Sequence, residues 1–102
     1  MDKTAYLEEI KTAFRVLHSC EADFMYTVPV KETFKGKVAW EGDVELFKLT
    51  GHPKTSFAYG WGFPKDSGKG WEITTVLELP PVDSPEMAVK ASIAARAQQA
   101  RN

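Results

Sequence analysis

The stretch from Lys37 to Phe63 constrains the fold most, because apolar and polar residues alternate through two consecutive segments. Successive side chains of a β-strand point to opposite faces, so the alternation predicts strands over residues 38–49 and 57–63. The segment Thr50–Lys54 between them predicts a turn. The second strand carries large rings on one face and only small residues on the other: Phe57, Tyr59, Trp61 and Phe63 against Ala58, Gly60 and Gly62.

The rest of the chain predicts two helices and two further strands. Residues 3–18 repeat apolar side chains every three or four positions, as an amphipathic helix does. Ser84-Pro85-Glu86 is a helix-start signal, since serine caps free amides and proline suits the first helical position. We expect this second helix to run to about residue 99, and strands over residues 24–34 and 71–79.

This order of elements predicts one α+β domain over residues 1–102, arranged α-β-β-β-β-α. Short turns between consecutive strands favour an antiparallel meander. Pro29 has no amide hydrogen for the sheet, so its strand is expected at an edge. We expect both helices to pack on one face, over the aromatic row, with the carboxylates Glu41, Asp43 and Glu45 on the other, wet face.

The strand over residues 38–49 contains one irregularity. Up to Leu46 its apolar residues have even numbers, whereas Phe47 and Leu49 are odd. Either the strand is bulged at Gly42, where glycine often marks such a bend, or its far end is buried on both faces. The pattern is compatible with both.

Charge and cysteine content exclude several classes of protein. Thirteen Lys and Arg against fourteen Asp and Glu give a net charge of −1, which counts against a dedicated nucleic-acid binder. The lone Cys20 excludes an internal disulfide and a multi-cysteine zinc site. No apolar run has the length of a membrane span, and the first residues do not resemble a signal peptide. We therefore expect a cytoplasmic protein.

Four residues are candidates for ligand binding: His52, Lys54, Tyr59 and Trp61. The aromatic row could be a stacking platform, but a core beneath the helices explains it better, with Tyr59 and Trp61 lining a pocket at the sheet edge. His52 could transfer a proton or contact a ligand beside Lys54, although bonding its own turn is the favoured interpretation. We assign no catalytic residue, no metal ligand and no cofactor.

The three strand carboxylates could hold a cation or perform acid–base chemistry. A solvated face explains Glu41, Asp43 and Glu45 more simply, because no apolar residue lies between them on that face.

Two resemblances accompany these patterns. The run Thr27-Val-Pro-Val-Lys-Glu-Thr-Phe-Lys-Gly-Lys37, with Trp40-Glu-Gly42 and Leu49-Thr-Gly-His-Pro-Lys54, resembles small bacterial proteins classed as hypothetical, over about half of the chain, and implies no activity. The order of elements is similar to that of the double-stranded-RNA-binding domain, whose last helix begins with a lysine cluster. Here that helix has only Lys90 near its start, so the resemblance extends to topology alone.

The sequence therefore predicts a binding or interaction module for a protein partner or a small ligand. An alternative is a small enzyme that uses His52 with a carboxylate of the strand 38–49. Nucleic-acid binding is a weaker alternative. Because a sheet edge without proline must be covered or paired, we also expect a homodimer through that edge.

Overall fold

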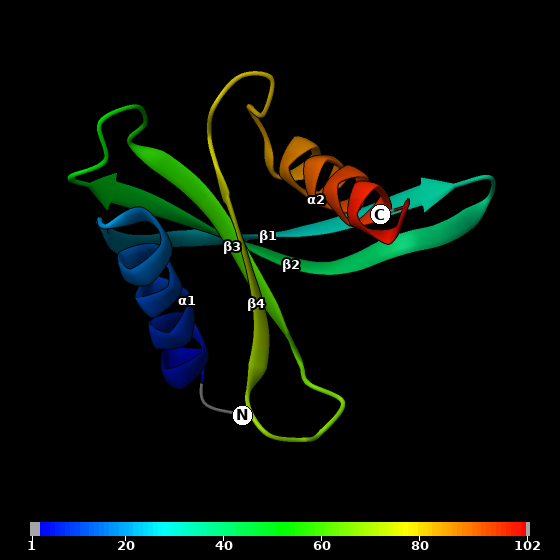
Figure 1. The fold of residues 1–102 in the computed structure, drawn as a ribbon, viewed down its shortest axis with the longest axis horizontal. Coiled ribbons are helices and arrows are strands. Elements are labelled where there is room, and N and C mark those ends of the chain that lie inside the picture. The colour runs from blue at the N-terminus through cyan, green and yellow to red at the C-terminus, as the bar shows by residue number, and fades with distance from the viewer. Residues whose placement is uncertain (1–2, 102) are drawn as a thin grey trace.

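A computed structural model describes residues 3–101, and the side chains of residues 3–97. The four strands form one antiparallel sheet in the order β1-β2-β3-β4, which confirms the α+β class and the meander. β1, which contains Pro29, lies at a sheet edge as predicted. The elements are α1 (Lys3–His18), β1 (Glu21–Phe34), β2 (Lys37–Thr50), β3 (Phe57–Pro64), β4 (Trp71–Leu77) and α2 (Pro85–Arg101) (Figure 1).

The two helices lie on opposite faces of the sheet. On one face of β3, α1 approaches so closely that a Cβ built on Gly60 would lie 2.6 Å from Cγ2 of Ile10. On the other face, Tyr59 and Trp61 pack in one cluster with residues of α2. Since neighbouring residues of a strand point to opposite faces, the prediction that both helices share one face is wrong.

The twist of the sheet explains this arrangement. In Figure 1 the direction of the strands turns from β1 and β2, through β3, to β4, and the helices fill opposite open quadrants between the crossing strands. Each helix thereby contacts both edge strands, β1 and β4. The small residues of β3 do not mark a wet face, because the missing side chains make room for α1.

Two hydrophobic clusters form the core, one under each helix. The cluster under α1 consists of Ile10, Phe14, Cys20, Ala22, Phe47, Leu49 and Ala58. The cluster under α2 consists of Val30, Val44, Tyr59, Trp61, Val82, Ala88 and Val89. Tyr59 and Trp61 are therefore covered by one helix and not by two, and the other two large rings of β3, Phe57 and Phe63, stay partly exposed.

The change of parity in β2 comes from burial on both faces. Leu46 pairs with Tyr59 on the α2 face, and Phe47 pairs with Ala58 on the α1 face. Gly42 pairs in register with Val30, so β2 is not bulged there. The irregularities of the β1–β2 pairing lie elsewhere, between residues 24 and 26 and between residues 32 and 33 of β1.

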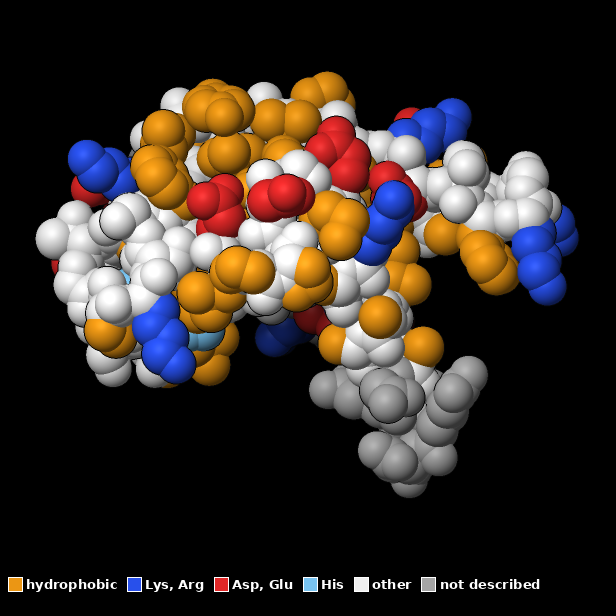
Figure 2. Space-filling view, turned by 90° about the horizontal axis from the view of Figure 1, so that it is seen from above, with side chains coloured by type: hydrophobic (Ala, Val, Ile, Leu, Met, Phe, Trp, Pro, Cys, Tyr) orange, Lys and Arg blue, Asp and Glu red, His pale blue; other side chains and the backbone are white. Residues whose placement is uncertain are grey.

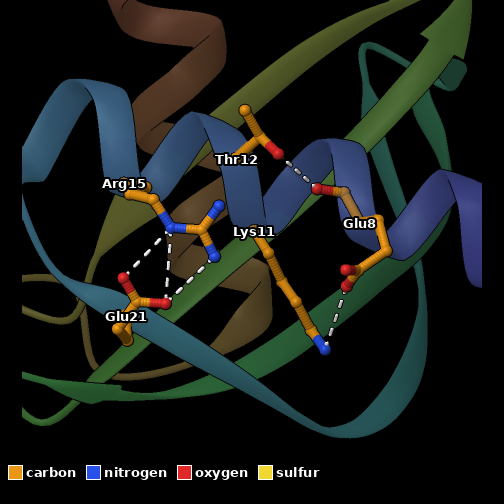
Figure 3. A network of polar contacts seen from close by, with 5 residues as sticks. All are labelled: Glu8, Lys11, Thr12, Arg15 and Glu21. Atoms are coloured by element: carbon orange, nitrogen blue, oxygen red, sulfur yellow. Dashed lines mark hydrogen bonds and ion pairs between the residues drawn. The ribbon is translucent and has the colours of Figure 1, made fainter.

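Local contacts hold the ends of the elements. Ser84 caps α2 as predicted, because its Oγ accepts a hydrogen bond from the Met87 amide at 3.2 Å. Arg15 donates two hydrogen bonds of 3.0 Å to Glu21, which ties the last turn of α1 to the start of β1 (Figure 3).

The β1–β2 hairpin projects beyond the helices, and its exposed turn contains Lys35 (Figures 1 and 2).

Gly60→Ala should lower the free energy of unfolding by roughly 1–3 kcal/mol, because the new methyl group would overlap Cγ2 of Ile10. Urea unfolding of both proteins measures the difference. The penalty should persist in an Ile10→Val background, which keeps Cγ2, and disappear in Ile10→Ala, which removes it. An equal penalty in all three backgrounds would show that the approach of α1 does not require this glycine.

Candidate functional site

A cavity of about 320 Å³ lies on the α1 face of the sheet, where the first turn of α1 meets the end of β3 and the start of β4. We call it the α1 cavity. Its walls combine charged side chains and aromatic rings with residues at the end of β3. The side chains that matter for its chemistry are Lys3, Tyr6, Asp43, Glu45 and Trp71.

Glu45 is the buried charged residue of this wall, with only 1% of its surface exposed. Burying a carboxylate is costly unless hydrogen bonds and an opposite charge compensate it. Here the Thr27 hydroxyl donates to Oε1, and the Lys3 ammonium lies 3.6 Å from the same oxygen. Lys3 also donates to Thr27 Oγ1 at 2.9 Å, so the three groups form one network.

The contacts described above involve one of the two carboxylate oxygens of Glu45. The hydrogen bond from Thr27 and the ion pair with Lys3 both involve Oε1. Every side-chain oxygen or nitrogen that is fully buried among the described residues has a hydrogen-bond partner. Glu45 itself lines the α1 cavity.

Two aromatic rings form the opposite wall. Tyr6 and Trp71 meet edge to face, with ring centroids 4.9 Å apart. The Tyr6 hydroxyl accepts a hydrogen bond from the Gly62 amide at 2.9 Å, which holds the ring over β3. Burial raises the pKa of Tyr6; the Gly62 bond opposes this rise, and the charges of Glu45 and Asp43 add to it. The phenol therefore stays protonated at neutral pH.

The turn candidates, His52 and Lys54, lie away from this cavity. Nδ1 of His52 accepts hydrogen bonds from the amides of Lys54 at 3.1 Å and Thr55 at 3.3 Å. The ring thus bonds its own turn, which is the interpretation that the sequence favoured. Its aromatic neighbour is His18, at 6.3 Å between ring centroids.

Tyr59 and Trp61 lie under α2, on the other face of the sheet, and each is only 2% exposed. Tyr59 donates a hydrogen bond of 2.7 Å to Glu78 Oε2. Trp61 lines a second cavity, of about 250 Å³, together with Trp40. The structure therefore does not bring the four sequence candidates into one site.

The α1 cavity contains residues that the sequence interpretation did not select. Glu45 was expected on a wet face with Glu41 and Asp43, and this expectation is wrong for Glu45, because α1 covers it. Glu41 and Asp43 are exposed as expected. The available signal was the change of parity at Phe47, which shows that apolar neighbours surround Glu45 on both sides of the strand.

Comparison of the chain with protein-family models, with curated proteins and with solved structures finds no match. Both resemblances noted in the sequence remain predictions. Within residues 3–101 no helix has the length and apolar character that crossing a membrane requires. In the same range no three His, Cys, Asp or Glu side chains gather where they could hold a metal ion.

His18 should make stability depend on pH. Its ring is half-buried beside Thr75, and burial, with a smaller contribution from His52, lowers its pKa below the usual value. The unfolded chain then binds this proton more tightly than the folded protein, so stability should fall as pH drops through about 6.5. Urea unfolding across this range should show a weaker pH dependence in His18→Gln, and an identical dependence in both proteins would contradict this assignment.

Proposed function

We propose that this protein is a binding module whose α1 cavity takes a small ligand. The observation that carries the proposal is the burial of Glu45 in the cavity wall. An apolar residue at this position would serve a core equally well or better, because a buried ion pair rarely repays its desolvation cost. Residues that oppose the packing rules in this way are expected at functional sites.

The size and lining of the cavity support a small ligand. Its volume of about 320 Å³ lies at the lower end of the range of roughly 300–1,000 Å³ that is typical of ligand sites. Such sites combine apolar and aromatic walls with a few polar groups that fix orientation. Tyr6 and Trp71 supply the aromatic wall, and Glu45 and Asp43 supply the polar groups.

The enzyme alternative has less support. It requires His52 beside a carboxylate of β2, but Nδ1 of His52 is used by its own turn. No hydrogen bond or ion pair among the described residues joins His52 to a carboxylate. The alternative still predicts that His52→Ala abolishes any turnover without lowering the melting temperature.

Two finer proposals concern assembly and location. β4 is the sheet edge without proline inside it, so we propose a homodimer through β4, which sedimentation velocity would test. A cytoplasmic location and a protein partner remain proposals from the sequence.

A screen of small molecules by NMR tests the proposed function. Bound molecules should shift the Gly62 amide and the Trp71 indole, which lie at the cavity. Trp71→Ala should weaken these molecules roughly tenfold or more, because it removes a stacking wall. The matched variant Trp40→Ala, which alters the second cavity, should leave their affinity unchanged.

Two outcomes of the screen would contradict the proposal. Either no molecule shifts the Gly62 amide, or the molecules that bind report on Trp40 and Trp61 instead. The second result would transfer the site to the α2 face of the sheet.

A further inference from the structure

The charges around the α1 cavity are unbalanced. Among the residues that the structure describes, two carboxylates, Asp43 and Glu45, line it together with one ammonium, that of Lys3. The Lys3 ammonium contacts Glu45 from the side of β1, where it donates to Thr27 and lies 5.7 Å from the centroid of the Phe24 ring. The Lys3 side chain is half-exposed, so its charge is partly screened by water. The wall of the cavity therefore keeps an excess of negative charge.

Glu45 also offers its carboxylate to a hydrogen-bond donor in the cavity. Its side chain is 2% exposed, and its contacts with Thr27 and Lys3 both involve Oε1. A carboxylate accepts hydrogen bonds on both of its oxygens. A ligand that carries N–H groups into the cavity would supply this donor.

Lys3 shows which chemistry this carboxylate accommodates. Its ammonium is held by a carboxylate oxygen, a hydroxyl oxygen and an aromatic ring, contributed by Glu45, Thr27 and Phe24. The α1 cavity brings together the same kinds of group, namely the carboxylates of Glu45 and Asp43 and the rings of Tyr6 and Trp71. Carboxylates and aromatic faces are the usual partners of organic cations.

We infer that the α1 cavity selects small primary amines with an aromatic or aliphatic body. The ammonium donates to Oε2 of Glu45 and faces Asp43, and the body packs against Tyr6 and Trp71. Lys3 acts as an internal competitor, because it neutralises part of the charge of Glu45. This inference rests on the proposed function and adds the class of ligand to it.

Anions and neutral molecules fit this cavity less well. An anion would add a negative charge beside Asp43 and a buried carboxylate, which is unfavourable at short range. A neutral alcohol can donate one hydrogen bond to Oε2 but leaves the excess charge uncompensated. The affinity of the cavity should therefore depend more strongly on the charge of the ligand than on its shape.

Three probes of similar size separate these possibilities: phenethylamine, 2-phenylethanol and phenylacetate. Their affinities are measured at neutral pH by titration, following the Gly62 amide. We expect the amine to bind at least about tenfold more tightly than the alcohol, since hydrogen bonds to charged groups are the stronger ones. Phenylacetate should bind most weakly.

Substitutions of Glu45 and Lys3 should change the affinity for the amine in opposite directions. Glu45→Gln, which keeps the shape of the side chain, should weaken the amine about tenfold or more and leave the alcohol unchanged. Lys3→Met should strengthen amine binding about two- to fivefold, because it removes the competing charge. Asp43→Asn, on an exposed residue, should weaken the amine without the risk of unfolding.

Two control variants carry the same changes of charge away from the cavity. Glu72→Gln removes a carboxylate that pairs with Arg96, and Lys11→Met removes an ammonium that pairs with Glu8 on α1. Neither should change the affinity for the amine. The melting temperature of each variant shows whether the fold is intact.

Each remaining outcome overturns the inference. Equal affinities of the three probes at the cavity would refute a preference for cations and leave the proposed function standing. Tighter binding of phenylacetate, or weaker amine binding in Lys3→Met, would assign the cavity to anions. If no probe shifts the Gly62 amide, the amine assignment fails, and the broader screen then decides whether the cavity binds any small molecule.

Discussion

The close approach of α1 to β3 is the contact on which the rest of the structure depends. Gly60 admits Ile10, and the Gly62 amide donates to the Tyr6 hydroxyl at 2.9 Å. A side chain on either glycine would meet the helix or its neighbours at once. Because the helix lies this low, it covers one face of the sheet completely enough to form a core. It also brings the first turn of α1 over the end of β3, which creates the α1 cavity.

The same packing buries Glu45. The carboxylate lies on the α1 face of β2, opposite Gly60 in the pairing with β3 and opposite Thr27 in the pairing with β1. Thr27 and Lys3 offset part of the cost of removing it from water, but they engage only one of its two oxygens. The proposed function would account for the retention of this charge, because Glu45 belongs both to the core under α1 and to the wall of the cavity.

Much of the fold could be predicted from local patterns. The helix over residues 3–18, the edge position of β1, the serine cap of α2 and the turn bonding of His52 all follow from short-range rules of geometry and hydrogen bonding. The side of the sheet that each helix covers does not follow from such rules. A bare face made of Ala58, Gly60 and Gly62 is compatible with exposure to water and equally with a closely packed helix.

The candidate site was missed for the same reason. Tyr59 and Trp61 were predicted as binding candidates because they are large rings with polar groups, but both are buried in the core. The alternation of β2 predicted that Glu45 lies on a polar face, whereas the structure shows it in the wall of the α1 cavity. By itself the sequence determined the elements, their order and their antiparallel pairing, because hydrophobic periodicity and turn residues act over a few positions. Only the tertiary structure decided which face each helix covers, since that depends on the twist of the whole sheet and on contacts between distant segments.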